Sequence, residues 1–543
     1  MLHSCGGIFL EERVSCKDLL ERSVSFIVSD RSVYLPQREE MAIALVSLIL
    51  VALVALYFYL TKNYDYWQKR NVPCVDGALP GVGHFWNVIT MKTTFSECCR
   101  KIYNNNRNRS MVGIYNFRSP ALIVLEPELV KTVMQTSFAN FHENGFKIDP
   151  ELDPLLANNP FFTSGEKWAT GRKRLTYAFS SMRLKILLES VEEVCQQFEN
   201  YLDKKLNKVE KIELELKDLF ARFTAQVVTG AGFGIDGLSF NEEKEKESFY
   251  AMGKSFLDPT GVNNIIFILI FFVPLLGKLF RMPFLPKKAD RFFRTIIADV
   301  MEQRRSEKVS RNDFLQLMAE LERVEGTKID LEVLVSHAVS FFIDGYETSS
   351  TVLSFAGFQL ASHPDVQEKL RNEVISVLDK YDGVITYEAL KEMTYMDQVI
   401  SESQRCVPAV GFLTKICTEA TELKGSDGLT CHVDRGMQIL IPVHGLQEDP
   451  RYWERPEVFD PERFGPDRKH SIERFAFLPF GEGPRICVGM RMAQLQMKAC
   501  LATLLRKYSL ELSPKTRTPL KMMASFFLAA AEGGLWAYIR PIH

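Results

Sequence analysis

The residue with the clearest chemical setting in this chain is a cysteine that stands just before a predicted helix. Cys487 lies in the loop FGEGPRICVG, which runs from Phe480 to Gly489. Gly481 and Gly483 allow a tight loop whose backbone can approach a flat ligand closely. Backbone amides at the start of a helix attract an anion, so the setting favours a thiolate at Cys487. Such a thiolate could serve as a nucleophile, a zinc ligand or a haem ligand.

Spacing excludes two other uses of this loop. No CxxC pair or nearby histidine completes a zinc site, and Cys500 is 13 residues away. A dinucleotide fingerprint beginning at Gly481 and Gly483 would need a glycine where the chain has Ile486. An isolated cysteine is usually buried and inert, but ten consecutive residues here fit the pattern of one family.

The loop resembles the cysteine loop of the cytochrome P-450 family, the haem-thiolate monooxygenases, and the resemblance covers essentially residues 62–543. It implies a mainly α fold with small β-sheets. It also implies a haem b group whose iron takes the Cys487 thiolate as its axial ligand. Further residues of the loop would contact this cofactor, namely Phe480, Gly481, Gly483, Arg485 and Gly489.

Two more motifs resemble parts of the same family. Trp168 and Arg172 match the WxxxR helix whose tryptophan and arginine bind a haem propionate, a task that suits the guanidinium fork. Glu402 and Arg405 match the ExxR helix, in which residues three apart share a face. Arg463, in the segment PERF, matches the third member of a buried Glu–Arg–Arg network that holds the loop under the haem. Taken alone, either helix motif would be an exposed surface pair.

The segment DGYET at 344–348 resembles the central helix over the distal face of the haem. The resemblance makes Glu347 and Thr348 catalytic, organising the water chain that delivers protons to the reacting oxygen. In isolation such a pair would indicate a back-bonded helix kink. Asp344 departs from the Ala or Gly of most relatives and adds a carboxylate whose role stays open. Lys415 stands about where many relatives have a propionate-binding arginine, and it would pair only as a point charge.

Residues 41–60 form a run of 20 without a charge, about 30 Å long as a helix, which predicts a transmembrane anchor. The run is too long for a signal peptide and has no small-residue cleavage site before Lys62. Acidic residues precede it and basic residues follow it, which predicts a cytosolic catalytic body. The expected organisation is an N-terminal extension at 1–40, an anchor at 41–61, a Pro- and Gly-containing linker at 62–85 and a catalytic domain at 86–543.

A second apolar stretch, Ile265 to Leu276, has 12 residues and contains Pro274. It is too short to cross a bilayer, so it is either a core helix or a segment that dips into the membrane interface. Basic residues beside it suit anionic headgroups, namely Lys278, Arg281, Lys287 and Lys288. The strand candidates are Ala121–Leu125 and Met437–Val443.

Composition agrees with this interpretation and excludes others. The chain has 66 Lys and Arg against 68 Asp and Glu, which gives no case for a nucleic-acid partner. Its 46% hydrophobic and 25% charged residues exclude wholesale disorder, and 11 cysteines in 543 residues are too few for a disulfide scaffold. The 39 phenylalanines, against 17 tyrosines, suit an apolar access channel or a membrane-dipping surface.

The resemblance implies a membrane-bound monooxygenase of the endoplasmic reticulum that inserts one oxygen atom from O₂ into a lipophilic substrate, such as a xenobiotic or a hormone. The sequence GYETSS at 345–350 most resembles that of insect microsomal members of the family. Electrons would come from NADPH through cytochrome P-450 reductase, with cytochrome b5 as a further candidate partner. The candidate docking residues for the reductase are Lys173, Arg174 and Arg491.

Four segments are the candidate substrate contacts, 138–162, 339–344, 409–413 and 522–528. The last contains Met522, Met523, Phe526 and Phe527, soft or apolar residues that suit a greasy substrate. Two alternatives remain open. One is a haem-thiolate isomerase or dehydratase that rearranges a peroxide, which would not need Glu347 and Thr348. The other is a haem- or lipophile-binding membrane protein without turnover.

Overall fold

The chain forms two compact units, the first ending at Lys62 and the second beginning at Asn63. The computed structural model describes residues 37–258, 261–272, 274–306, 312–525 and 527–542. Most of the expected N-terminal extension at 1–40 and the candidate contact Phe526 therefore lie outside the described residues.

The first unit contains one long helix, α2 (Gln37–Thr61). Its segment Met41–Thr61 has a mean hydropathy of 2.8 and none of it is buried. A helix of 21 residues that is apolar on every side is long and apolar enough to cross a membrane. The run predicted as an anchor therefore forms a single continuous helix that is a candidate membrane span.

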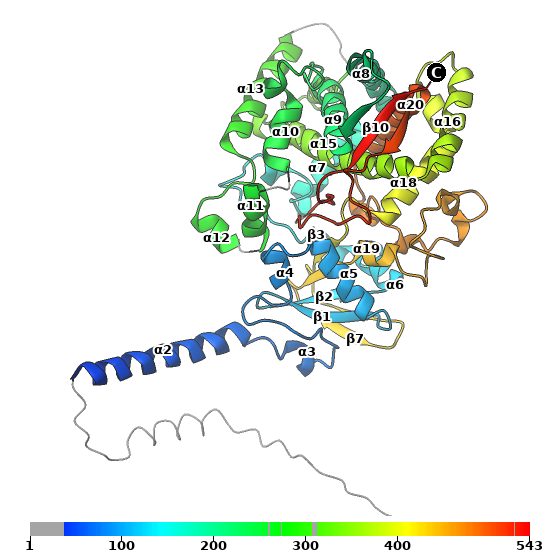
Figure 1. Ribbon diagram of the computed structural model, residues 1–543. Helices are drawn as coiled ribbons and strands as arrows, with labels where there is room; N and C mark the ends of the chain where they lie inside the picture. Colours follow the sequence, from blue (N-terminus) through cyan, green and yellow to red (C-terminus); the bar gives the residue numbers. More distant parts are fainter. Residues whose placement is uncertain (1–36, 259–260, 273, 307–311, 526, 543) are drawn as a thin grey trace, which may run out of the picture. The chain divides into compact units, whose positions relative to one another are not determined.

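The second unit is mainly helical (Figure 1). Its helices are α3 (Tyr66–Lys69), α4 (Trp86–Ile89), α5 (Phe95–Asn105), α6 (Pro127–Lys131), α7 (Gly165–Ala178), α8 (Ser181–Leu206), α9 (Leu216–Phe233), α10 (Phe249–Leu257), α11 (Gly261–Phe272), α12 (Pro274–Leu279), α13 (Lys287–Ser306), α14 (Phe314–Glu325), α15 (Leu331–Ser362), α16 (Pro364–Asp379), α17 (Tyr387–Glu392), α18 (Thr394–Cys406), α19 (Val443–Gln447) and α20 (Met490–Lys507).

Three small sheets complete this unit. Their strands are β1 (Met111–Asn116), β2 (Ser119–Val124), β3 (Glu143–Asn144), β4 (Ile212–Glu215), β5 (Leu413–Ile416), β6 (Thr421–Lys424), β7 (Thr430–Val433), β8 (Gln438–Ile441), β9 (Tyr508–Leu512) and β10 (Trp536–Pro541). The largest sheet has the order β1-β2-β8-β5-β3, in which β2 and β8 run parallel and the other pairs antiparallel. The two strands predicted from the sequence are thus confirmed as β2 and β8, which are neighbours.

The helix α15 runs through the middle of the helical part of the molecule (Figure 1). It begins at an N-cap, because the Asp330 carboxylate accepts hydrogen bonds from the backbone amides of Glu332 and Val333. It ends before Pro364, which starts α16. Apolar side chains on all its faces join two hydrophobic cores, one shared with α8, α9 and α20 and one with α10, α13 and α14. Such a helix is buried by its composition and can hold its few polar residues at fixed positions.

Candidate active site

The cysteine loop is folded by contacts that only glycine permits. Gly483 has a φ of +73°, and a Cβ there would lie 2.0 Å from the backbone oxygen of Met134. The next turn closes when the Cys487 amide donates a 2.9 Å hydrogen bond to the carbonyl of Phe480. Gly489 then caps α20. The loop therefore presents Cys487 from a backbone that packs directly against a neighbouring segment.

The thiol of Cys487 is desolvated and yet accessible. The amides of Gly489 and Met490 donate to the sulfur and lower its pKa, as expected at a helix start. Burial outweighs them and raises the pKa to about 11, so the protein alone favours the thiol and a bound metal cation would have to favour the thiolate. Cys487 nevertheless keeps an exposed surface. A side chain that is both desolvated and accessible borders an internal hollow.

Asp344, in the middle of α15, borders the same hollow. More than a third of its surface is accessible, although Ile343 before it is 9% exposed and Tyr346 after it is 1% exposed. Burial raises the pKa of its carboxyl to about 7. The negative charge of Asp344 is also among the causes that raise the pKa of Cys487. The hollow therefore lies between α15 and the cysteine loop.

Three cations gather at this hollow without an acidic partner. The Arg172 Nη1 donates to the carbonyl of Ile486 at 2.6 Å. The two Nη atoms of Arg485 donate to the carbonyls of Pro160 at 3.0 Å and Thr163 at 2.7 Å, and its buried Nε has no hydrogen-bond partner. The guanidinium also lies 4.6 Å from the ring centre of Trp168. These contacts are all to neutral groups.

Lys415 is the third cation and lies on β5 with 5% of its surface exposed. Its Nζ donates to Asn144 Oδ1 at 2.7 Å. Burial and the charge of Arg485 lower its pKa to about 7, and burial lowers the pKa of Arg485 to about 10. Within the described residues, no carboxylate lies in ion-pair distance of Arg172, Arg485 or Lys415. Buried cations are normally paired, so the site fits a ligand that brings its own negative groups.

These residues fit a haem b group. Its two propionates would pair with the three cations, and its planar ring suits a loop that glycines keep close to the ligand. Within the described residues, no group of three or more His, Cys, Asp and Glu side chains could hold a bare metal ion. A haem would bring its own ring ligands for the iron, so a single thiolate such as Cys487 would suffice from the protein. The predicted cofactor residues Cys487, Arg485, Trp168 and Arg172 are thus brought together.

Glu402, Arg405 and Arg463 also lie together, as a buried network rather than as surface pairs. The Arg405 guanidinium donates to both Glu402 oxygens at 2.8 and 2.9 Å, and Arg463 Nε donates to Glu402 Oε1 at 3.3 Å. Glu402 and Arg405 are 0% exposed. Arg405 also donates to the carbonyl of Gln447 at the end of α19, to the carbonyl of Pro456 after it, and to the sulfur of Cys406. Breaking a buried pair of this kind typically costs about 3–5 kcal/mol.

Glu347 and Thr348 take different orientations on α15. The Thr348 hydroxyl donates to the backbone oxygen of Asp344 at 2.5 Å, the back-bond expected for such a pair, and its side chain stays partly exposed. Glu347 forms a 2.9 Å ion pair with Lys217 of α9, whose Nζ also donates to Ser350 Oγ at 2.9 Å. Sequence reasoning missed Lys217, because nothing in its local pattern marks it.

A cluster of phenylalanines connects the segments proposed for substrate contact. Phe146 lies 6.0 Å from Phe161, 5.6 Å from Phe527 and 6.1 Å from Phe412, measured between ring centres. Phe271 of α11 joins it at 5.3 Å. We call the following residues the phenylalanine cluster: Phe146, Phe161, Phe162, Phe271, Phe412 and Phe527.

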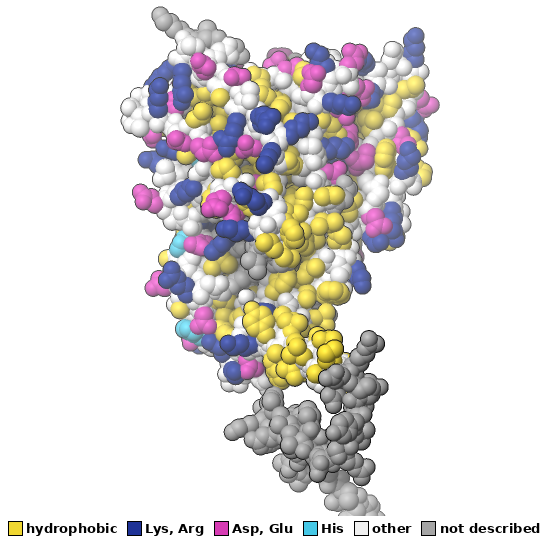
Figure 2. All heavy atoms as spheres, turned by 90° about the vertical axis from the view of Figure 1, so that its left-hand side faces the viewer, with side chains coloured by type: hydrophobic (Ala, Val, Ile, Leu, Met, Phe, Trp, Pro, Cys, Tyr) yellow, Lys and Arg dark blue, Asp and Glu magenta, His cyan; other side chains and the backbone are white. Residues whose placement is uncertain are grey.

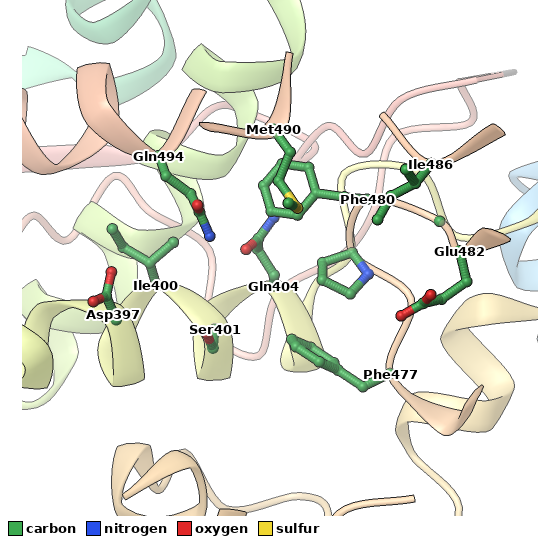
Figure 3. A pocket seen from close by; sticks show the side chains of 12 residues that line it. Asp397, Ile400, Ser401, Gln404, Phe477, Phe480, Glu482, Ile486, Met490 and Gln494 are labelled. Atoms are coloured by element: carbon green, nitrogen blue, oxygen red, sulfur yellow. The ribbon is translucent and has the colours of Figure 1, made fainter. Parts of the chain in front are cut away.

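A second hollow lies beside the cysteine loop and has a volume of about 210 Å³. Cys487 does not line it, and its volume falls below the roughly 300 Å³ at which small-molecule sites begin. Figure 3 shows it between α18 and the loop, with two acidic side chains at its rim. Asp397 is paired with Lys498 at 2.8 Å and Glu482 with Arg474 at 2.8 Å. It is therefore a poor substrate site.

The three candidate docking residues differ in accessibility. Lys173 of α7 and Arg491 of α20 are exposed. Arg174 is half-buried, and its positive charge contributes to lowering the pKa of the buried His337. Lys173 and Arg491 are thus available to a partner, whereas Arg174 is turned partly into the fold.

Comparison with known proteins identifies the fold family. The family model described as Cytochrome P450 matches residues 75–536. Cytochrome P450 9e2 of Blattella germanica is 33% identical over 518 residues, which cover 90% of this chain and 96% of that protein. Probable cytochrome P450 28a5 of Drosophila melanogaster is 33% identical over 507 residues, covering 91% and 98%. Cytochrome P450 6j1 of Blattella germanica is 32% identical over 497 residues, covering 92% and 97%. The family resemblance and the fold class predicted from the motifs are confirmed, and the chain belongs to the cytochrome P-450 family of monooxygenases.

Proposed function

We propose that this protein is a membrane-bound, haem-thiolate monooxygenase that inserts one oxygen atom from O₂ into a lipophilic substrate. The observation that carries the proposal is the hollow between α15 and the cysteine loop. It combines the most accessible cysteine of the described residues, Cys487, with one buried and two half-buried cations that form no ion pair among those residues, namely Lys415, Arg172 and Arg485.

The bound haem would supply the oxygen activation, helped by electron donation from the thiolate. The chain's own residues have separate tasks. Arg172, Arg485, Lys415 and Trp168 orient the cofactor through its propionates. Thr348 lies beside Asp344 on the opposite wall, where its hydroxyl can hand a proton to the reacting oxygen. Glu347 would relay protons from solvent on the side of α15 where its carboxylate is paired with the Lys217 ammonium.

The phenylalanine cluster would hold the substrate. Its rings come from segments 138–162, 409–413 and 522–528 and from α11, and they lie close to each other although they are far apart in the sequence. Apolar walls with few polar groups are typical of sites for greasy ligands, and excluding water protects the reaction. Met522 and Met523 are half-buried beside this region of the chain and add adaptable surface.

Electrons would arrive from NADPH through cytochrome P-450 reductase, with cytochrome b5 as a further candidate. Lys173 and Arg491 are the exposed basic residues that support this docking. Charge complementarity would speed the encounter of the two proteins.

The helix α2 would anchor the protein in the endoplasmic reticulum, with the catalytic unit in the cytosol. A second contact would come from α11 and α12. Within the stretch from Ile265 to Leu276, Phe267 and Ile268 are buried, whereas Ile265 is 42% and Leu276 is 37% exposed. Figure 2 shows hydrophobic side chains gathered on the face that includes these helices. The stretch therefore combines both alternatives, a core side and an exposed apolar side suited to the membrane interface.

The carbon monoxide spectrum of the reduced protein tests this function. We expect the red-shifted Soret band of a thiolate-ligated haem in the wild type and its loss in Cys487→His. Cys74→Ser, which changes a cysteine outside the hollow, should keep the band. A surviving band in Cys487→His would show that another residue holds the iron. If the protein converted peroxides in the absence of NADPH and reductase, and formed no product from other substrates when NADPH and reductase were supplied, the isomerase would be favoured instead.

A further inference from the structure

Asp344 differs from the other acidic residue of the middle of α15 in having no cation beside it. Glu347 is paired with Lys217 at 2.9 Å. Within the described residues, no lysine or arginine lies in ion-pair distance of Asp344. The one hydrogen bond to its side chain there comes from Asn159 Nδ2 at 3.4 Å. At that length the bond is weak. The carboxylate therefore keeps most of its capacity to accept hydrogen bonds.

Asn159 fixes the direction in which Asp344 can act. Its Oδ1 accepts a 2.7 Å hydrogen bond from the amide of Phe161, so its side chain is held by the backbone. Asn159 is 3% exposed and offers its Nδ2 to Asp344 Oδ2 only. The other oxygen, Oδ1, has no hydrogen-bond donor among the described residues and belongs to a side chain open to the hollow.

The surroundings of this carboxylate are apolar. Phe161 and Phe162 follow Asn159 directly and belong to the phenylalanine cluster. Burial is the main cause of the raised pKa of Asp344, so the carboxyl itself is largely removed from water. An acceptor in such surroundings binds a charged donor far more strongly than it would in water. Without a donor, the desolvated acceptor lowers the stability of the fold.

We propose that Asp344 is a specificity-determining residue that makes this enzyme prefer lipophilic substrates carrying a protonated amine. The ammonium group would bind the free Asp344 carboxylate oxygen, and the apolar part of the substrate would lie among the phenylalanine cluster. A basic nitrogen matches the unpaired Oδ1 of Asp344, and the aromatic rings match the apolar remainder of the substrate. This inference rests on the proposed function, because it assigns the substrate class of the same site.

A matched pair of ligands tests the proposal on the full-length, haem-loaded protein in membranes. One ligand is 4-phenylbutyldimethylamine, whose nitrogen is tertiary and protonated. The other is its carbon isostere, with CH(CH₃)₂ in place of N(CH₃)₂. Dissociation constants come from substrate-binding difference spectra and, independently of the haem, from equilibrium dialysis. We expect the wild type to bind the amine about tenfold or more tightly than the isostere.

Two substitutions at Asp344 separate its charge from its shape. Asp344→Asn keeps the shape, and Asp344→Ala removes the polar group. Both should weaken amine binding about tenfold or more and change isostere binding less than threefold. Glu332→Gln removes a carboxylate from the exposed start of the same helix and should leave both constants unchanged.

Three results would overturn the proposal. The wild type could bind amine and isostere equally, or both Asp344 variants could keep the preference for the amine. Asp344→Ala could also shift the ligand-free Soret band without changing ligand preference, which would mean that the carboxylate acts on the iron. The carbon monoxide spectrum separates these failures from a failure of the proposed function, since a normal band shows that the haem-thiolate centre is intact.

Discussion

At the scale of single residues, α15 offers two threonines with similar bonds and different surroundings. The Thr348 hydroxyl donates to Asp344 O and stays partly exposed, whereas the Thr351 hydroxyl donates to Glu347 O at 2.9 Å and is 1% exposed. Only Thr348 can therefore reach a group bound in the hollow. Comparing substitutions at Thr348 and Thr351 therefore distinguishes a loss of proton delivery from a general effect on the helix.

We expect Thr348→Ala to lower the ratio of product to released peroxide by roughly tenfold, because the hydroxyl no longer positions a proton donor. Thr351→Ala should keep the wild-type ratio. The measurement compares NADPH consumed, product formed and hydrogen peroxide released in the presence of reductase. Equal ratios in Thr348→Ala and the wild type would remove Thr348 from the proton path.

His337, two turns before Asp344 on α15, predicts an acid sensitivity of the fold. It is 2% exposed, and neither ring nitrogen has a hydrogen-bond partner. Burial, and then the charge of Arg174, lowers its pKa to about 4. Between the ordinary histidine pKa near 6.5 and this value, the unfolded chain binds a proton that the folded chain does not. Folding stability should therefore fall as pH falls through that window.

His337→Phe keeps a flat ring and removes the titration. Between pH 6.5 and 5 the wild type should lose about 2 kcal/mol more than the variant. Above pH 7 the difference between them should not depend on pH. Urea unfolding at a series of pH values measures this, with exposed His470→Gln as the control. Parallel curves for wild type and His337→Phe would contradict the prediction.

At the scale of elements, the cysteine loop and the turn between β6 and β7 contain glycines with nearly the same backbone. Gly483 has a φ of +73° and Gly428 a φ of +82°. A Cβ on Gly483 would lie 2.0 Å from Met134 O, whereas a Cβ on Gly428 meets nothing within 4 Å. Alanine at either position pays for the left-handed backbone, about 1–2 kcal/mol, but only at Gly483 must the neighbouring segment move.

We expect Gly483→Ala to lose most of the carbon monoxide band per mole of protein, because the loop can no longer seat Cys487 against the segment at Met134. Gly428→Ala should keep its haem content and lose only a little thermal stability. Haem content and the spectrum, measured on the same preparations, decide between them. Equal haem content in the two variants would mean that the contact between residue 483 and Met134 does not determine haem binding.

The sequence was a good guide where a few neighbouring residues determine the chemistry. Cys487 and the pair Glu402 and Arg405 follow from short motifs, and the apolar helix at 41–61 follows from composition. Partners that meet through the fold could not be predicted. Lys217 reaches Glu347 from 130 residues away, and Asn159 reaches Asp344 from 185 residues away. The orientation of the Asp344 side chain could not be predicted either. The helix α15 is apolar on every side, so its hydrophobic pattern does not distinguish one face from another.

At the scale of the whole molecule, the exposed apolar side of α11 and α12 predicts that the catalytic unit binds membranes without α2. Leu279 is 70% and Phe280 67% exposed, and the exposed cations Lys278, Arg281 and Lys287 lie beside them. Apolar side chains would enter the interface and the cations would meet anionic headgroups.

A chain that lacks residues 1–62 should therefore still bind vesicles containing anionic lipid. Leu279→Glu with Phe280→Glu should weaken this binding about tenfold or more, because two large apolar side chains no longer transfer from water into the membrane interface. Val324→Glu is the matched control, because Val324 is 80% exposed and lies on a different helix, α14. Co-sedimentation with vesicles measures the effect. Equal binding by the double variant and the control would remove α11 and α12 from the contact.

The parts of the haem site are widely separated along the chain, and this has a consequence for its synthesis. The Arg172 guanidinium lies against Ile486, next to Cys487, 315 residues after Arg172 itself. Ribosomes add roughly 5–20 residues per second, so about 16–63 seconds pass between the appearance of the two residues. Arg172 and most of the phenylalanine cluster are thus synthesised long before the cysteine exists, whereas Arg485 precedes it by only two residues. If Cys487 holds the iron as proposed, a chain truncated before it should fail to retain haem.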